Sequence, residues 1–252
     1  MSKAAHETAL KQSSEEELNR MSAGERRFFR PPYRKATLWR YLETYKFENL
    51  LNSGTLYLRQ VAKLAEEEQN EGRMNQIQEK ALLEYLSNDQ TELNNFRAFH
   101  EHVRQNSWVT CFSLGEFDEA HMWERFCKHP PNEGVAIRTN YERLASNIDR
   151  CSNSRCAMVR YLESGYMPYK TDYLLFQKIP TFSVEREVRV CVLNLEEEHP
   201  NDYLQLPVNL ASLIQRVYVH PNASEENRQK VYALVLKRLP KNKHLVRWSR
   251  YH

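Results

Sequence analysis

The segment from Phe182 to Leu193 constrains the fold most, because its residues alternate as they do in a β-strand. One set of alternate positions holds Val184, Arg186, Val188, Val190 and Val192. The other set holds Glu185, Glu187, Arg189 and Cys191. The sequence therefore predicts one strand over 182–193 with two carboxylates and a guanidinium on the same face. The same pattern is typical of a half-buried strand with a solvated charged face, so a purely structural interpretation stays open.

Segments typical of strands and helices are mixed irregularly along the chain, without repeating βαβ units. Further strands are predicted at 37–42, 55–59, 107–114, 133–139, 156–162, 203–206 and 216–219, with a last short one near 245–248. Helices are predicted at 47–53, 118–126, 141–148 and 224–237, and two or more lie between 62 and 105, broken near 87–89. These elements predict an α+β fold with a mixed, mostly antiparallel central sheet and a helical insertion.

The length of 252 residues suits one α+β domain with an insertion. Residues 1–35 are polar, helix-compatible and rich in arginine towards Pro31 and Pro32, which predicts a helical, basic N-terminal arm. We expect a single domain over 36–252, with the helical insertion at about 62–105. The net charge of +3 is too small to indicate nucleic-acid binding by itself, but it permits an anionic ligand.

Cysteine usage and hydropathy indicate the compartment. The five cysteines form no CxxC motif and no paired Cys/His spacing, which predicts reduced thiols, a cytosolic protein and no metal site. The N-terminus lacks the apolar segment of a secretory signal. No run approaches the roughly 18 apolar residues of a membrane span. We therefore expect a cytoplasmic protein that does not contact the membrane.

Several motifs occur in a fixed order along residues 36–250. They are Leu38-Trp39-Arg40-Tyr41, Ser53-Gly54-Thr55-Leu56-Tyr57-Leu58, Trp108-Val109-Thr110-Cys111-Phe112-Ser113, Met122-Trp123, Glu133-Gly134-Val135-Ala136-Ile137, Lys178, Glu185-x-Glu187-x-Arg189 and Ile214-x-x-Val217-Tyr218-Val219. In this order they resemble a widespread bacterial family catalogued as domain of unknown function 2971. The chain departs from that family at Ala65–Gly72, where the family has an Asp-Pro turn, and at Phe182, where it often has tryptophan.

The order of parts more distantly resembles the ADP-ribosyltransferases, which implies an ADP-ribosyltransferase-like sheet that binds NAD as a substrate. On this resemblance Arg40 holds NAD, Ser113 supplies a strand hydroxyl and Glu187 is the catalytic carboxylate. Glu185 is implied to orient or deprotonate the acceptor. The expected NAD-binding set is completed by Tyr41, Tyr57 and Trp123, with Tyr57, Phe112 or Trp123 as rings that could stack on nicotinamide or adenine.

These residue types suit the chemistry that the resemblance implies. Cleavage of the nicotinamide–ribose bond develops positive charge on the ribose, which a fixed carboxylate stabilises. A guanidinium binds two phosphate or ribose oxygens at once. The expected function is ADP-ribosyl transfer from NAD to a macromolecular acceptor, protein or nucleic acid, in a bacterial toxin or antiphage setting. Further partners to consider are an antitoxin and a second copy of the chain.

Two other classes of function stay open. In a non-catalytic module that binds a nucleotide or a protein, Glu187 would only pair with Arg189, Lys178 or Arg138. A nucleic-acid-binding or processing protein is the other alternative. It rests on basic residues before and after the expected core, namely Arg26, Arg27, Arg30, Arg34, Lys35, Lys237, Arg238, Lys241 and Lys243.

Overall fold

The structure is a computed structural model that describes Phe29 and residues 32–64, 71–128, 132–149, 151, 153–162, 171–195, 201–240 and 245–249. Some predictions fall outside the described residues. They are most of the 1–35 arm, the acidic segment 65–70, and the basic residues Arg26, Arg27, Arg30, Lys241 and Lys243.

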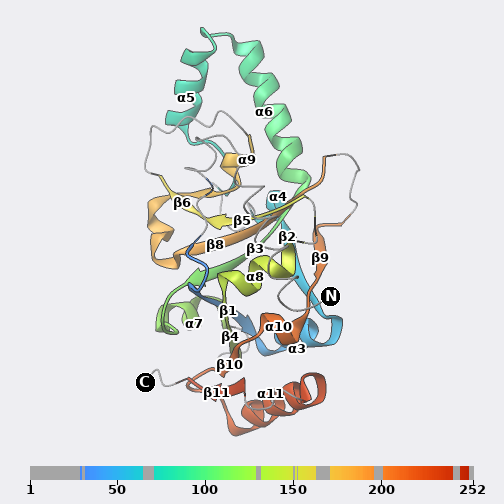
Figure 1. Cartoon of the computed structure of the whole chain (residues 1–252). Coiled ribbons are helices and arrows are strands. Elements are labelled where there is room, and N and C mark those ends of the chain that lie inside the picture. The colour runs from blue at the N-terminus through green and yellow to red at the C-terminus, as the bar shows by residue number, and fades with distance from the viewer. Residues whose placement is uncertain are drawn as a thin grey trace.

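Within the described ranges, nine strands form one sheet whose main path runs β11-β10-β4-β1-β3-β2-β9 (Figure 1). Their bounds are β1 (Thr37–Glu43), β2 (Thr55–Gln60), β3 (Ser107–Leu114), β4 (Gly134–Asn140), β5 (Ser154–Met158), β8 (Glu187–Leu193), β9 (Tyr203–Pro207), β10 (Arg216–Val219) and β11 (Val246–Trp248). Strand β8 branches from β3 and carries β5 on its other side. Each pairing in this sheet is antiparallel except β10 with β11. The predicted mixed, mostly antiparallel sheet is therefore confirmed.

A second, two-stranded sheet pairs β6 (Arg160–Tyr161) with β7 (Gln177–Lys178) in parallel. The helices are α3 (Thr44–Ser53), α4 (Val61–Leu64), α5 (Gln76–Tyr85), α6 (Gln90–Gln105), α7 (Ala120–Phe126), α8 (Tyr141–Ile148), α9 (Thr171–Leu174), α10 (Leu210–Leu213) and α11 (Glu225–Arg238). Among the described residues, none is both long enough and apolar enough to cross a bilayer.

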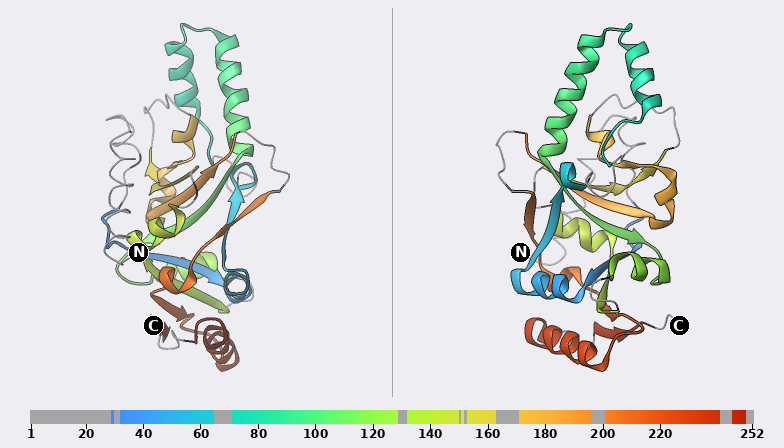
Figure 2. Two further views of the ribbon diagram at one scale, coloured as in Figure 1. Left: turned by 45° about the vertical axis from the view of Figure 1, so that its right-hand side comes forward. Right: turned by 180° about the vertical axis from the view of Figure 1, so that it is seen from behind.

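The helices predicted between 62 and 105 are present, and α5 and α6 project together beyond the sheet (Figure 1 and Figure 2). Ser87 and Asn88 join them with φ values of 54° and 63°, the left-handed conformation that ends a helix. The Asp89 carboxylate then caps α6 by accepting hydrogen bonds from the backbone N–H groups of Thr91 and Glu92. The break predicted near 87–89 is thus confirmed. Ser87 and Asn88 end the first helix, and Asp89 begins the second.

Strand β1 separates two apolar clusters, which decides where its side chains point. Leu38 and Leu42 join the largest cluster, which packs the sheet against α3, α8 and α11. Trp39 and Tyr41 point the other way and pack with Trp123 of α7.

The strand predicted over 182–193 is wrong in its first half. Residues Pro180–Glu185 form a 3-10 helix, and Arg186 follows with φ of 43°, so β8 begins only at Glu187. Pro180 fixes a backbone angle suited to the first helical turn, and the left-handed Arg186 ends it. Val184, which the alternation places on the valine face, is instead 59% exposed.

The solvated charged face considered for this strand is also wrong. Strand β8 is paired along both edges, with β3 and β5, and apolar clusters cover both of its faces. Its valines join the largest cluster, and Cys191 on the other face joins a second one. Glu187, Arg189 and Cys191 are as buried as the valines between them. Buried carboxylates and guanidinium groups need partners, and these partners build the site described next.

Candidate functional site

A cavity of about 1040 Å³ opens over β1, β2 and β3, with walls from α3, β9 and the region around β8. Six of the seven predicted site residues line it, namely Arg40, Tyr41, Tyr57, Ser113, Glu185 and Glu187. These residues lie far apart in the sequence. The antiparallel order β1-β3-β8 brings three of their strands together, because Ser113 lies opposite Glu187 and also opposite Trp39, the residue before Arg40. The volume is at the upper end of the range for ligand pockets and suits a molecule as large as a dinucleotide.

Arg40 is the cationic residue of β1 that faces this cavity. Its position between Leu38 and Leu42 turns it towards the large apolar cluster, where its guanidinium lies 5.5 Å from the centre of the Phe112 ring. Nη2 donates a hydrogen bond to the carbonyl of Tyr57 at 3.3 Å, whereas the buried Nη1 has no hydrogen-bond partner among the described residues. Burial lowers the pKa of Arg40 to about 10, against the opposing effect of Cys111. Arg40 therefore stays charged at neutral pH.

No carboxylate among the described residues forms an ion pair with Arg40. A buried charge without a counter-ion is costly, and an anion in the cavity would remove that cost. Arg40 thus has the properties of a residue that binds an anionic ligand.

Ser113 and Tyr41 line the cavity with polar groups that already have partners. The Ser113 hydroxyl donates to the carbonyl of Glu185 at 2.8 Å and so fixes the end of the 3-10 helix against β3. The Tyr41 hydroxyl accepts from the backbone N–H of Glu119 at 2.9 Å. Burial raises the pKa of Tyr41, which therefore stays neutral. Both residues hold the walls of the cavity in place.

Tyr57 presents an aromatic surface at the rim. Its ring is 50% exposed and stacks on Tyr203 of β9, with ring centres 5.5 Å apart and planes inclined by 19°. The two strands are hydrogen-bonded edge neighbours, which keeps the rings side by side. Tyr203 was missed in the sequence, because its strand carried no motif. A flat heteroaromatic ring could extend this stack.

Trp123 lies outside the cavity lining, contrary to the predicted stacking role. Its ring is buried against Tyr41 and His220, and its indole N–H donates to Asp118 at 3.1 Å. The short helix α7 has one apolar face, and Met122 and Trp123 both use it to contact the sheet. Trp123 is therefore a core residue.

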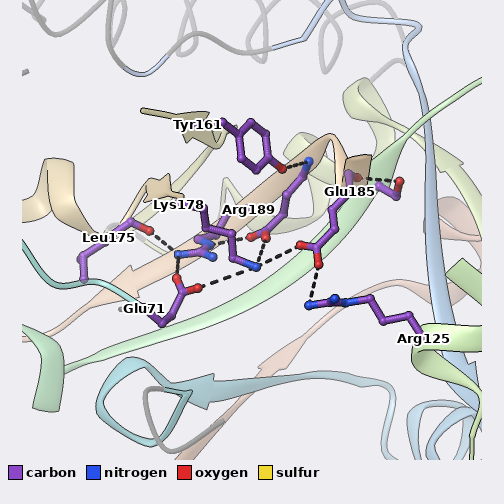
Figure 3. Close-up of polar contacts among 9 residues, drawn as sticks. Glu71, Arg125, Tyr161, Leu175, Lys178, Glu185 and Arg189 are labelled. Carbon is purple, nitrogen blue, oxygen red and sulfur yellow. Dashed lines mark hydrogen bonds and ion pairs between the residues drawn. The ribbon is translucent and has the colours of Figure 1, made fainter. Parts of the chain in front are cut away.

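Three carboxylates surround Lys178 at the bottom of the cavity (Figure 3). The Lys178 ammonium is 3.0 Å from Glu185, 3.1 Å from Glu187 and 3.7 Å from Glu71. Its side chain is only 8% exposed. Glu187 and Glu71 raise the pKa of Lys178 and outweigh the burial that lowers it. We name Glu71, Lys178, Glu185 and Glu187, together with Arg189 and Arg125, the charged cluster.

Two arginines complete the charged cluster (Figure 3). Arg189 joins Glu187 through Nε and Glu71 through Nη1, each at 2.6 Å, and Nη1 also donates to the carbonyl of Leu175. Arg125 of α7 reaches Glu185 at 2.7 Å. Three cations thus balance three carboxylates, which is the condition for burying them together.

Glu187 is the most strongly held carboxylate of the charged cluster. Burial raises its pKa, but Arg189 and Lys178 outweigh burial and bring it to about 2. The nearby Cys111 thiol also contributes to the lowered pKa of this carboxylate. The backbone N–H of Glu187 donates to the Tyr161 hydroxyl at 2.9 Å. Glu187 is therefore ionised and fixed in position across the physiological pH range.

The structural interpretation of Glu187 is right about its partners Arg189 and Lys178, whereas Arg138 lies elsewhere, over the ring of Trp39. Sequence reasoning missed Glu71, Arg125 and Tyr161. Glu71 belongs to the segment Ala65–Gly72, in which the chain departs from the resembled family, and that departure was the available signal. Arg125 and Tyr161 had none.

The cavity wall carries five cationic side chains and three carboxylates within the described part of the chain. The excess positive charge suits a diphosphate, and the fixed Glu187 suits a developing cation. The Cys111 thiol also lines the cavity, but burial raises its pKa well above the ordinary value, so it is a poor nucleophile. In the described ranges, no group of three or more His, Cys, Asp or Glu side chains is arranged to hold a metal ion.

No family model matches the chain. No curated protein matches it either. Among solved structures, it is similar to DarT from Thermus sp. 2.9 in complex with carba-NAD+, at 10% identity over 87% of this chain and 97% of that chain, with a TM-score of 0.39. It is also similar to the same protein in complex with NAD+, at 10% identity over 84% and 92%, with a TM-score of 0.38. Similarities of this size establish neither a family nor a ligand for the chain. Membership of the bacterial family that the motif order resembles, domain of unknown function 2971, therefore stays a prediction.

Proposed function

We propose that the cavity binds NAD and that the protein transfers ADP-ribose from it to a macromolecular acceptor. The observation that carries this proposal is the position of Arg40. Its guanidinium, which is partly buried with Nη1 out of contact with solvent, lacks a carboxylate partner among the described residues, and it shares one cavity with the ionised Glu187. Arg40 binds the diphosphate, Glu187 stabilises the ribose cation, and the Tyr57 and Tyr203 rings stack on a base.

The proposed transfer breaks the bond between the nicotinamide nitrogen and the ribose C1′. Nicotinamide leaves with the bonding electron pair as a neutral ring, and positive charge develops on the ribose next to Glu187. An acceptor oxygen or nitrogen then bonds to C1′ and releases its proton to Glu185. The Arg125 and Lys178 contacts hold Glu185 ready for this step.

Incubation of the purified full chain with NAD labelled in its adenylate group, with cell lysate as the acceptor source, tests the proposal. We expect label on a macromolecular fraction together with released nicotinamide. The absence of both label transfer and NAD loss in the presence of lysate would refute it. The toxin or antiphage setting, the antitoxin partner, the second copy of the chain and the cytoplasmic location stay predictions.

A nucleotide-binding module without catalysis is the second candidate. It is favoured by the complete pairing of Glu187 with Arg189 and Lys178, which gives the carboxylate a structural role. This candidate predicts saturable NAD binding without nicotinamide release. The nucleic-acid alternative has less support from the structure. Two of its basic residues already have partners within the protein, because Arg34 pairs with Glu142 at 2.6 Å and Arg238 donates hydrogen bonds to Asn52.

Arg40→Met should weaken NAD binding about 10- to 100-fold, because a charge-assisted hydrogen bond contributes roughly 1.5–3 kcal/mol. The free energy of unfolding without ligand should stay equal or rise, because the variant removes a partly buried charge that has no counter-ion among the described residues. Titration calorimetry and urea unfolding measure the two quantities. Arg34→Met, on an exposed arginine paired with Glu142, is the matched control and should change neither. Equal NAD affinity in Arg40→Met and the wild type would remove Arg40 from the site.

Tyr57→Ala should weaken NAD binding about tenfold, since stacking of one base on an aromatic ring contributes roughly 1–3 kcal/mol. Tyr57→Phe keeps the ring beside Tyr203 and should bind NAD like the wild type. Calorimetric titration of both variants separates the ring from its hydroxyl. A similar loss in both variants would show that the hydroxyl matters and the stack does not.

A further inference from the structure

A second hollow, of about 340 Å³, lies in the other half of the sheet and shares no described lining residue with the proposed NAD cavity. It lies where β4 ends and β10 begins, beside α8 and α10 (Figure 1). Three arginines from separate elements line it, namely Arg138, Arg143 and Arg216. Ala211, Ile214 and Leu245 add an apolar wall.

The three arginines gather positive charge that nothing described compensates. Arg138 and Arg216 are direct cross-strand partners in β4 and β10. Like charges directly opposite each other destabilise an antiparallel pair. Among the described residues, no carboxylate forms an ion pair with Arg138, Arg143 or Arg216. The arrangement is therefore unfavourable for the empty protein and favourable for a bound anion.

Neutral groups fix the arginines in place. Arg143 donates from Nη1 to the carbonyl of Ser212 at 2.5 Å, and Arg216 donates from Nη1 to the carbonyl of Gln215 at 2.7 Å. With its amide oxygen turned towards Arg143, Gln215 accepts from Nε at 3.2 Å. Arg138 lies over the Trp39 ring at 6.0 Å, and its buried Nε has no hydrogen-bond partner in the part of the chain that the structure describes. Each guanidinium has five N–H donors, so these contacts orient the groups and leave donors for a ligand.

We propose that this hollow is a second anion site, which binds the phosphate group of a small phosphorylated ligand. Guanidinium groups bind phosphate oxygens in pairs, and three of them can surround one phosphate. The volume lies at the low end for ligand pockets, which fits a phosphate with a small apolar or uncharged body and is well below that of the first cavity. The site does not depend on the proposed reaction with NAD.

Titration with inorganic phosphate at constant ionic strength tests the site, with binding followed by phosphorus NMR. The full-length Arg40→Met variant serves as the background, because it weakens phosphate binding in the first cavity. We expect saturable binding of phosphate, with an affinity that falls at least tenfold when Arg143→Met or Arg216→Met is added. Arg143→Lys keeps the charge but removes the paired N–H donors, so its phosphate affinity should fall at least threefold. Arg34→Met, which removes an exposed arginine on the adjacent surface, should leave binding unchanged.

Circular dichroism and urea unfolding establish that each variant is folded before its binding is measured. Equal effects of Arg143→Met and Arg34→Met would overturn the proposal, as would the absence of saturable binding. A parallel titration uses a short single-stranded oligonucleotide in place of inorganic phosphate. If it binds through Arg143 and inorganic phosphate does not, the small-ligand assignment is wrong. In the wild-type background, Arg143→Met should leave NAD affinity intact, and a matching loss would show that the two sites are not separate.

Discussion

Glu187→Gln should lower the rate of ADP-ribose transfer by about 100- to 1,000-fold, while NAD affinity stays within about threefold of the wild type. The amide keeps the shape of the side chain but removes the negative charge that stabilises the ribose cation. Arg40 and the Tyr57 stack, which bind NAD in this proposal, are unchanged. Initial rates at saturating labelled NAD measure the first effect, and calorimetric titration measures the second.

Glu71→Gln is the matched control for this variant. Glu71 is buried like Glu187 and contacts the same two cations, Arg189 at 2.6 Å and Lys178 at 3.7 Å. Both variants leave these cations with one carboxylate fewer, so both should lower the free energy of unfolding. The specific loss of rate should appear only in Glu187→Gln. If both variants lose rate in proportion to their loss of folded protein, Glu187 has a structural role. That result would favour the second candidate function, a nucleotide-binding module without catalysis.

Local pattern was sufficient for much of the fold. Runs of β-prone residues predicted β1, β3 and β4. The helix predicted to end at residue 53 does end there, because Gly54 takes up the left-handed conformation with φ of 66°. The same reasoning failed at 182–186, where alternate charges suggested a strand. Pro180 and the left-handed Arg186 set the backbone there, and the alternation carried no information on either.

The site could be predicted only in part, for a physical reason. Arg40, Ser113 and Glu187 lie on neighbouring strands of one sheet, so motif order along the chain was a guide to their proximity. Glu71, which itself lies in a turn outside any helix or strand, joins Arg189 from 118 positions away. Contacts of that kind depend on how loops pack, which the pattern within either segment does not specify. Trp123 was misassigned because an aromatic ring on an amphipathic helix suits a core as well as a ligand.

Lys178→Met should lower the free energy of unfolding by about 3–5 kcal/mol at neutral pH, since it breaks a buried ion cluster by removing one partner. Methionine keeps much of the apolar stem but leaves three carboxylates with two arginines. Urea unfolding measures the change. Lys230→Met, on an exposed lysine 3.5 Å from Glu48, is the control and should change stability by less than about 0.5 kcal/mol.

The pH dependence separates lost charge from lost packing in Lys178→Met. In the wild type, Glu187 has a pKa of about 2 against an ordinary value of 4.5, so its contribution is present above 4.5 and is lost as pH falls towards 2. In the wild type, burial already raises the pKa of Glu71, against the opposing effects of Arg189 and Lys178. Without Lys178 the carboxylates repel one another more strongly, and the pKa of Glu71 should rise further. That penalty is present at high pH and is relieved as pH falls, because the folded variant then takes up a proton. The stability difference between the two proteins should therefore narrow between about pH 7 and pH 4. A difference that stays constant over this range would show that Lys178 acts through its packed stem, and the charged cluster would then not be held together by its central cation.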